Sequence, residues 1–256
     1  KTVSAGFEAL TLDDGLVAYY PFTNGSADNV VTDAHHGTIT DAVPTADRHG
    51  TANAAFDFPG ETAKITIPHA PELKSQTFSI SLWLKTDFVP QYSATDLLIC
   101  MDVSIPPGGT HYGWMLSYWD DGKVGFAVDP STAGDDEEIY TQFVSDAAVG
   151  DNRWHHVVWL YDGTMRMVID GVLQSQTAAG HYLPTAAEVI LGNAPLSLSR
   201  YHYDGALDDL RFYNRVLSGE EVAELYTGVK GMPSDMVQVE GGTFTMGDTW
   251  GDGEDD

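Results

Sequence analysis

Short alternations of apolar and polar residues predict β-strands along most of the chain. In the clearest of them, residues 77–85 divide between two faces, with Phe78, Ile80, Leu82 and Leu84 on one and Ser79, Ser81 and Trp83 on the other. Further strands are expected at Leu16–Tyr20, Ala54–Phe58, Ala63–Ile67, Leu97–Asp102, Tyr112–Tyr118, Lys123–Val128, Ile139–Val144, Glu188–Leu191 and Ala206–Tyr213. The run Trp154–Tyr161 is apolar on both faces, which is typical of a central strand. Roughly a dozen short strands at this spacing predict an all-β fold, an antiparallel β-sandwich.

Asp-Gly pairs mark tight turns between several of these strands. Asp162-Gly163 and Asp170-Gly171 divide the segment from Trp154 to Thr177 into three strands. A two-residue hairpin loop of this composition is typical of a type I′ turn, in which both residues have positive φ. We therefore expect a meander of two hairpins here.

One helix is expected, close to the end of the chain. Ser218 and Glu221 have the spacing of a capping box, and an apolar stripe follows from Val222 to Tyr226. Gly228 is suited to end this helix in the left-handed conformation. The segment from Gly231 to Ser234 then reads as a linker.

Acidic side chains outnumber basic ones by 38 to 12, which gives a formal net charge of -26. Such a surface repels phosphate groups, so nucleic acid and anionic membrane surfaces are not expected as partners. No apolar run approaches the roughly 20 residues that span a bilayer, so membrane insertion is not expected. The single cysteine, Cys100, cannot form an internal disulfide and lies in an apolar run, where a buried inert thiol is expected. The chain starts at Lys1 and carries no signal-peptide pattern, so we expect a mature or excised fragment of a secreted or cell-surface protein.

Four segments, in this order and spacing, resemble the laminin-G-like, concanavalin-A-like lectin/glucanase jelly-roll family in its bacterial extracellular form. They are Gly15-Leu-Val-Ala-Tyr-Tyr-Pro-Phe22, Phe78–Lys85, Arg153–Gly163 with its continuation Val168-Ile-Asp-Gly171, and Gly205–Ser218. The resemblance implies a jelly-roll domain over residues 13–230, preceded by an N-terminal arm at residues 1–12. It also implies that function resides in sites grafted on the fold, because this scaffold carries lectins, adhesins and enzymes.

A second resemblance begins after the linker. Residues Met236–Gly247, followed by an acidic Asp/Gly run, are similar to the start of a formylglycine-generating-enzyme (sulfatase-modifying-factor) type domain. The chain carries only the beginning of such a domain and lacks its later cysteines. Residues 231–256 are therefore expected to be a linker and a truncated, non-catalytic stub.

The resemblance also implies a structural calcium site, in which an N-terminal loop meets the Asp-Asp pair of the last core strand. Here the corresponding residues are Asp28, His36, Gly37, Asp208 and Asp209. Strand alternation places Asp208 on the same face as Leu210 and Phe212, so we expect an inward carboxylate whose burial Ca²⁺ would offset. The alternative is that Asp208 caps a turn or pairs with Arg211 or Arg215.

Aromatic residues beside polar turn residues predict a carbohydrate-binding surface, because ring faces stack on the apolar faces of sugars. The expected contact residues are Tyr112, Trp114, Tyr118, Trp119, Tyr201, His202 and Tyr203. Trp83 is a candidate for the floor of a groove. The alternative for all of these rings is core packing, which we expect for Trp83 and Trp154.

Catalytic patterns are not found. The pairs His35-His36 and His155-His156 are adjacent, and neighbours in a strand point to opposite faces, so neither pair can chelate one metal ion from one face. No strand carries the paired Glu spacing of a retaining glycoside hydrolase, and no Gly-x-Ser-x-Gly elbow is present.

The sequence therefore predicts a non-catalytic, calcium-stabilised extracellular module that binds a glycan or polysaccharide. The alternative is a structural or adhesive domain that contacts other surface proteins or copies of itself. In that case the alternating arm at Lys1–Thr11 is suited to add as a strand to a neighbour.

Overall fold

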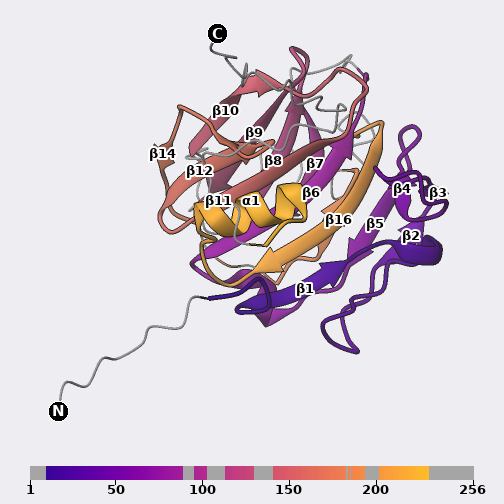
Figure 1. Cartoon of the computed structure of the whole chain (residues 1–256), viewed down its shortest axis with the longest axis horizontal. Helices are drawn as coiled ribbons and strands as arrows, with labels where there is room; N and C mark the ends of the chain where they lie inside the picture. The colour runs from indigo at the N-terminus through magenta and orange to yellow at the C-terminus, as the bar shows by residue number, and fades with distance from the viewer. Residues whose placement is uncertain are drawn as a thin grey trace, which may run out of the picture.

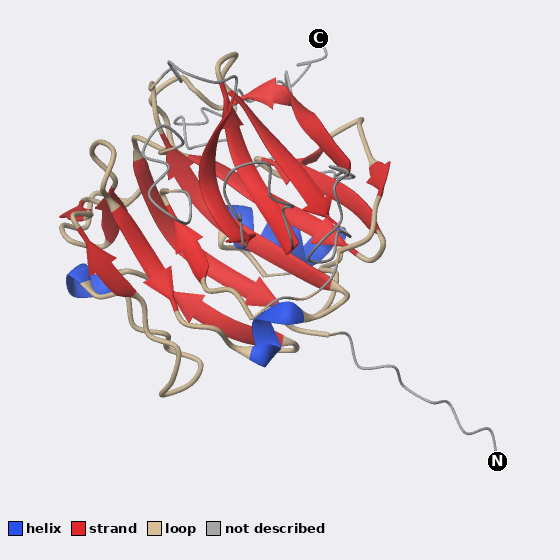
Figure 2. Cartoon of the chain, turned by 180° about the vertical axis from the view of Figure 1, so that it is seen from behind, coloured by secondary structure: helices blue, strands red, loops and turns tan. Residues whose placement is uncertain are grey.

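A computed structural model describes residues 10–88, 95–102, 113–129, 141–182, 184, 186–193 and 202–230, and gives only the backbone at 95–97 and 102. The expected stub at 231–256 and residues 1–9 of the expected arm lie outside this part. Within it the chain forms two antiparallel sheets that pack as a sandwich (Figures 1 and 2). The predicted all-β sandwich is confirmed.

The first sheet has nine strands among the described residues and the order β13-β12-β11-β6-β16-β4-β3, with β1 beside β16 and β14 beside β12. Its strands are β1 (Leu16–Tyr20), β3 (Val43–Thr45), β4 (Ala55–Asp57), β6 (Phe78–Lys85), β11 (His155–Tyr161), β12 (Thr164–Ile169), β13 (Val172–Leu173), β14 (Ala178–Ala179) and β16 (Ala206–Tyr213). The second sheet has the order β10-β9-β8-β7-β15-β5-β2. Its strands are β2 (Thr38–Thr40), β5 (Lys64–Ile67), β7 (Thr95–Asp102), β8 (Gly113–Trp119), β9 (Lys123–Asp129), β10 (Thr141–Ala148) and β15 (Val189–Leu191).

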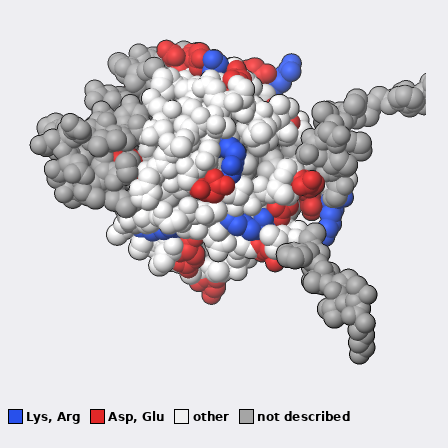
Figure 3. Space-filling view, turned by 90° about the vertical axis from the view of Figure 1, so that its left-hand side faces the viewer, with Lys and Arg blue, Asp and Glu red and all other residues white. Residues whose placement is uncertain are grey.

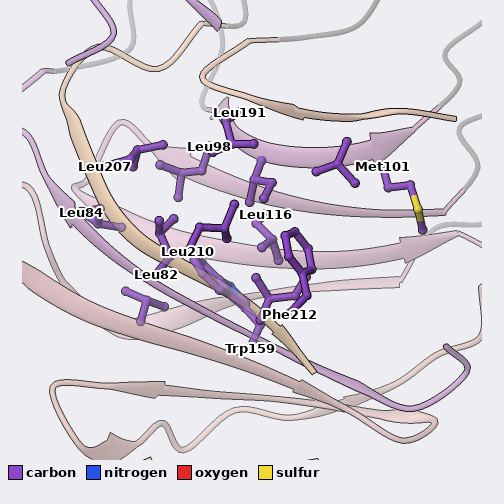
Figure 4. Close-up of a cluster of buried hydrophobic side chains, with 14 of the residues drawn as sticks. Leu82, Leu84, Leu98, Met101, Leu116, Trp159, Leu191, Leu207, Leu210 and Phe212 are labelled. Carbon is purple, nitrogen blue, oxygen red and sulfur yellow. The ribbon is translucent and has the colours of Figure 1, made fainter. Parts of the chain in front are cut away.

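The main core fills the space between the sheets. Its members include Leu82, Leu84, Trp159, Leu207, Leu210 and Phe212 from the nine-stranded sheet and Leu98, Met101, Leu116 and Leu191 from the other (Figure 4). Each large apolar side chain removed from water contributes roughly 1.5–3 kcal/mol. The predicted inward face of β6 is confirmed, because Phe78, Ile80, Leu82 and Leu84 all belong to this core. Cys100 is fully buried, as expected.

A second, smaller core lies on the outer face of the nine-stranded sheet, under helix α1 (Gly219–Thr227) (Figure 1). Val222 and Leu225 of the helix pack there against Val158, Leu160 and Val168. The predicted capping box is confirmed, and Gly228 ends the helix at a φ of 70°. Ser79 and Ser81 are fully buried, so β6 is covered on both faces.

The two predicted hairpins are confirmed as β11-β12 and β12-β13, but their turns differ. Asp170 and Gly171 both have positive φ, at 49° and 78°, as a type I′ turn requires. In the other turn only Gly163 does, at 93°, so the prediction of a type I′ turn at Asp162-Gly163 is wrong.

Charged side chains are distributed unevenly over the surface. In the view of Figure 3 much of the surface carries neither acid nor base, and several of the groups drawn lie as neighbouring red and blue patches. Ion pairs of this kind include Arg166 with Asp162, where 2.7 Å separates Nη2 from the carboxylate oxygen. Because acids and bases pair locally in this way, an acidic side chain that lies without a nearby cation is a better indication of a binding site. No helix of the described residues is long and apolar enough to cross a membrane.

Candidate functional site

A pocket of about 240 Å³ opens at one end of the nine-stranded sheet. There the ends of β3, β4 and β6 meet the starts of β11 and β16. Its lining residues are Thr45, Ala46, Asp57, Lys85, Thr86, Asp87, Asn152, Trp154, Asp204, Gly205 and Ala206. The pocket is thus built from five segments that are far apart in the sequence.

The backbone at Gly205 brings β16 close enough to β6 to form the inner wall of the pocket. Its φ of 152° is one that residues with a side chain rarely adopt, and an added Cβ would lie 2.6 Å from the carbonyl oxygen of Lys85. The Gly205 carbonyl accepts a hydrogen bond from the N–H of Phe58 at 2.9 Å, which ties the same point to the end of β4. This wall is therefore fixed by the backbone of three neighbouring strands.

Thr86, which is buried, joins the remaining walls. Its hydroxyl donates to the carbonyl oxygen of Asp204 at 2.6 Å and accepts from the N–H of Phe88 at 2.9 Å. Its own carbonyl accepts from the N–H of Asn152 at 2.9 Å. One residue after β6 therefore holds both the segment before β16 and the segment before β11.

Carboxylates give the pocket its charge. Asp57 and Asp204 are half-buried, Asp87 is exposed, and Lys85 supplies the one basic side chain of the lining. Burial and the neighbouring Asp204 carboxylate raise the pKa of Asp57. Among the described residues neither Asp57 nor Asp204 takes part in an ion pair, so both can accept hydrogen bonds from a ligand.

Trp154 supplies an aromatic surface in the same pocket. It is half-buried and lies directly before β11, two residues after Asn152, which has a φ of 63°. A partly exposed indole beside carboxylates is an arrangement that saccharide sites use, because the ring covers apolar sugar faces while the acids accept from hydroxyls. Core packing was expected for Trp154, but the structure leaves this residue half-buried in the lining of the pocket.

Three of the residues predicted to contact sugar lie in the core instead. Trp114 and Tyr118 are 1% exposed and Tyr203 is 0% exposed, so the prediction that they stack on a ligand is wrong. Alternation along β8 turns Trp114 and Tyr118 inward, and the Tyr118 ring packs edge-on against Tyr203 at 6.1 Å. The Tyr203 hydroxyl donates to the carbonyl of Lys85 at 3.1 Å, so this residue supports the pocket from beneath.

The other predicted contact residues do not form one site with these. Trp119 is half-buried at the end of β8, where its Nε1–H donates to the Ser117 hydroxyl at 3.1 Å. His202 is half-buried, and its ring lies 5.6 Å from the ring of Phe88, the residue that follows the pocket residue Asp87 in the sequence. Tyr112 and Tyr201 lie outside the described residues. Trp119 and His202 therefore stay predictions.

Asp208 and Asp209 are held by arginines. Arg48 donates from Nη1 to Asp208 at 2.7 Å and from Nη2 to Asp209 at 2.5 Å. Asp209 also contacts Arg211 at 3.3 Å and accepts from the Tyr19 hydroxyl at 2.5 Å. Of the alternatives that the sequence left open, ion pairing is what the structure shows, but the partner of Asp208 among the described residues is Arg48 and not the predicted Arg211 or Arg215.

The predicted direction of Asp208 is wrong, and a β-bulge explains why. The register of β16 against β6 shifts between Asp208 and Arg211, and Asp209 has a φ of 55°. Leu207 and Leu210 both belong to the main core, so the bulge leaves both aspartates on the outer face. Burial and the charge of Asp209 raise the pKa of Asp208 to about 7. Burial opposes ionisation of Asp209 as well, but Arg211, Arg48 and the Tyr19 hydroxyl outweigh it and hold its pKa below the ordinary value.

Trp83 lies under the same cluster and does not floor a groove. It is 8% exposed, Arg48 lies 4.7 Å above its ring, and Tyr226 of α1 stacks on it at 5.8 Å. His156 packs against Trp83 at 5.0 Å and forms a hydrogen bond with the Ser81 hydroxyl at 2.8 Å.

The loop predicted to supply the other calcium ligands is organised by a buried amide. Asn29 is 4% exposed, accepts from the N–H groups of Tyr19 and Val31, and donates to Thr32 and the carbonyl of Ala34. Asp28 is exposed and lies 3.5 Å from His36, while Gly37 packs where a Cβ would meet Ile65 at 2.7 Å.

These residues do not fit a calcium site as predicted. Arginine nitrogens already occupy the carboxylates of Asp208 and Asp209. Within the part that the structure describes, no three His, Cys, Asp or Glu side chains are grouped as a metal site. Calcium binding therefore stays a prediction without a donor set to carry it.

Sequence reasoning missed most of the pocket. Asp57 and Asp87 had no motif, and Trp154 stood in a segment assigned to the core by its family pattern. The one usable signal was Asp204-Gly205 directly before a strong strand, because a glycine there points to a close backbone approach.

Residues 59–223 match the family described as the Concanavalin A-like lectin/glucanases superfamily, and the chain belongs to this family. Among curated proteins, no relative matches the sequence. Several solved structures share the fold at low identity. The binding domain of Paraclostridial Mosquitocidal Protein 1 is 15% identical, with a TM-score of 0.63 over 85% of this chain and 53% of that one.

Domain 4 of AbnA, an extracellular arabinanase of Geobacillus stearothermophilus in complex with arabinotriose, is 19% identical, with a TM-score of 0.61 over 83% of this chain and 98% of that one. The binding domain of botulinum neurotoxin DC, in complex with SialylT, is 13% identical, with a TM-score of 0.61 over 84% of this chain and 52% of that one. The chain therefore spans about half the length of the toxin binding domains it matches.

Proposed function

We propose that this chain is a non-catalytic carbohydrate-binding module and that its site is the pocket at the end of the nine-stranded sheet. One observation carries the proposal: a half-buried indole, Trp154, and two carboxylates that form no ion pair with any described residue, Asp57 and Asp204, line the same open cavity. Two structural neighbours, the arabinanase domain and the botulinum toxin domain, are complexes with arabinotriose and SialylT, which supports saccharide as the ligand class.

The charge of the pocket limits the classes of saccharide that it can bind. Three aspartates against one lysine repel a carboxylate, so sialylated and uronic-acid sugars are disfavoured. Neutral or amino sugars can donate hydroxyl or ammonium protons to Asp57 and Asp204. We therefore propose a neutral or amino-sugar glycan, recognised by stacking on Trp154 and by hydrogen bonds to these acids.

Three further features belong to this proposal. We propose that the module is secreted or surface-exposed, and the origin of one structural neighbour in an extracellular arabinanase supports this. It has no catalytic role, although Asp57 and Asp204 together are groups that a glycoside hydrolase could use. Calcium, if bound, stabilises the scaffold and does not contact the glycan.

A structural or adhesive role is the second candidate, and one observation favours it. Val172 and Leu173, which form the short strand β13 at the edge of the nine-stranded sheet, are 60% and 59% exposed. An exposed apolar edge strand is suited to pair with another chain. A mass that rises with concentration, and that returns to the monomer value on Val172→Lys, would support this role.

The test of the main proposal is a glycan and polysaccharide binding screen, run with Ca²⁺ and with a chelator. The variants are Trp154→Ala and, as a matched control, Trp119→Ala, which removes another half-buried indole at the end of a strand. Loss of one stacking contact predicts about tenfold weaker binding for Trp154→Ala only. Both variants are checked for folding by circular dichroism.

Three outcomes would contradict the proposal. No binding by folded protein in either condition would exclude glycan recognition, and loss of binding with Trp119→Ala alone would place the site elsewhere. Release of reducing sugar from the bound glycan, abolished by Asp204→Asn, would contradict the non-catalytic role.

A further inference from the structure

His155 forms two ion pairs at the start of β11, directly beside the pocket. Its Nδ1 lies 2.7 Å from the Asp170 carboxylate, and its Nε2 lies 2.9 Å from that of Asp151. Both ring nitrogens can donate only when the imidazole is protonated. Neutral His155 therefore keeps one of these bonds as a donor and loses the other.

The two carboxylates anchor the segment that enters the pocket. Asp170 also accepts from the backbone N–H of His156 at 2.9 Å, which fixes His155 to the β12-β13 turn. Asp151 also accepts from the backbone N–H of Arg153 at 3.0 Å, which closes a tight turn around Asn152. His155 thus connects a rigid hairpin at one side to the turn at the other.

Residues 151–155 carry two groups of the pocket lining, Asn152 and Trp154. Asn152 holds a positive φ of 63°, which costs free energy for a residue with a side chain and persists only where neighbours enforce it. The enforcing contacts are the bond from its N–H to Thr86 and the Asp151 carboxylate on the following residues. Loss of the Asp151–His155 pair weakens the second, because the Asp151 carboxylate then holds the turn only through the N–H of Arg153.

The charges around His155 favour its protonated form. The hydrogen bond to Asp170 and then that to Asp151, against partial burial, raise the pKa of His155 above its ordinary value. Arg153 lies 3.8 Å from Asp151 and is the nearby cation. The adjacent His156 is fully buried, and burial lowers its pKa to about 3, so it stays neutral when His155 titrates. On β6 the residue paired with His155 is the apolar Leu84, which carries no charge.

We propose that protonated His155 is a positioning residue that holds the segment 151–155 in its ligand-binding arrangement, so that saccharide binds more tightly in acid or neutral solution than in alkaline solution. This inference rests on the proposed function of the pocket. A group whose proton is retained by two carboxylates stabilises the arrangement at low pH, and the stabilisation is lost as pH rises through its raised pKa.

The first measurement needs no ligand. In isotope-labelled protein the indole N–H signal of Trp154 is assigned by its absence in Trp154→Phe and followed from about pH 5.5 to about pH 9 with the ring C–H signals of His155. We expect the two to move together. In His155→Gln the Trp154 signal should no longer follow pH, whereas in the control His69→Gln, which replaces an exposed histidine, it should titrate as in the wild type.

The second measurement is the affinity for the best glycan of the screen over the same range. Loss of one charge-assisted hydrogen bond predicts about fivefold weaker binding at the alkaline end. His155→Gln and Asp151→Asn should bind at that weaker level at every pH, and His69→Gln should behave as wild type. Thermal melts at each pH show that the folded fraction is unchanged.

The outcomes separate this inference from the function it rests on. If His155 titrates while neither the Trp154 signal nor the affinity changes, the positioning role is overturned. If the Trp154 signal follows His155 but no saccharide binds at any pH, the positioning role stands and the proposed function fails. If binding is lost in Trp154→Ala yet does not depend on pH, the function stands and this inference fails.

Discussion

Two groups of aspartates lie near the start of β16, one on the strand itself and one formed by Asp204 with Asp57 of the neighbouring β4, and their surroundings differ. Asp208 and Asp209 are 2% and 6% exposed, and arginines hold both carboxylates. Asp204 and its neighbour Asp57 are half-buried, line an open cavity, and form no ion pair among the described residues. The first group has the contacts of a structural cluster, whereas the carboxylates of the second can still accept hydrogen bonds from a ligand.

The difference shows why a buried pair of acids is weak evidence for a metal site. A buried carboxylate needs a compensating charge, and a nearby arginine supplies it as well as a cation from solution would. The informative acids are those that the fold leaves partly solvated beside an aromatic ring. That distinction points to the pocket and away from the Asp208-Asp209 pair.

The largest expected effect is the loss of Arg48. Arg48→Met leaves Asp208 buried without the one ion-pair partner that it has among the described residues, and removal of one partner from a buried pair costs about 3 kcal/mol or more. The cost should be greater at alkaline pH, where Asp208 cannot escape by binding a proton. Urea unfolding at acid pH and at alkaline pH measures this loss of stability. The control is Arg166→Met, which breaks an exposed ion pair. Equal stability of the two variants would mean that the cluster is not structural.

A substitution at Gly205 tests the end of the nine-stranded sheet where the pocket lies. Gly205→Ala places a Cβ 2.6 Å from the Lys85 carbonyl at a φ of 152°, so we expect a loss of about 2 kcal/mol as well as a displaced pocket wall. Gly163→Ala, whose Cβ meets nothing within 4 Å, is the matched glycine with positive φ. An unperturbed melting temperature for Gly205→Ala would show that the wall is not held by the backbone.

The pH dependence of stability separates the two groups of acids. Asp208 has a folded pKa of about 7 against an ordinary value of 3.8, so between these values the folded protein binds a proton that the unfolded chain has lost. Its contribution to the unfolding free energy is therefore full below this window and falls as pH rises through it. Relative to Asp208→Asn, wild-type stability should decline from acid to neutral pH. A constant difference between the two proteins across this window would contradict the account.

The smallest expected effect on stability is at the pocket. Asp57→Asn and Asp204→Asn each remove a carboxylate that no cation of the described residues pairs with, so the unfolding free energy should change by no more than about 0.5 kcal/mol. Asp57→Asn should, if anything, stabilise, because Asp204 repels the Asp57 carboxylate. Binding of a neutral glycan should weaken in both. A destabilisation as large as that of Arg48→Met would erase the contrast between the two groups.

Sequence alone predicted the scaffold well. The observed bounds of β1 and β16 are the predicted ones. The two faces of β6 and the capping box of α1 also match their predictions, because each feature follows from a local pattern with a fixed period or spacing. The two-residue strand β14 was not predicted, because a pair of residues carries no periodicity and no Asp-Gly turn marks it.

The site was predicted poorly, for two physical reasons. A bulge at Asp209 adds one residue to β16, and strand alternation cannot anticipate the reversal of faces that results. The pocket also joins residues from distant segments, such as Asp57, Trp154 and Asp204, and only the fold brings them together. Aromatic residues near turns were a misleading signal, since Tyr118 and Tyr203 proved to be core supports of the pocket.

The most direct test of the central claim follows the six tryptophans of this chain while a neutral oligosaccharide from the screen is added. Isotope-labelled indole N–H signals report each ring separately. The account predicts that the signal of Trp154 shifts and saturates with the glycan, while those of Trp119 and the buried Trp114 and Trp159 stay in place. A saturating shift at Trp119 with none at Trp154 would contradict it and move the site to the face of the seven-stranded sheet.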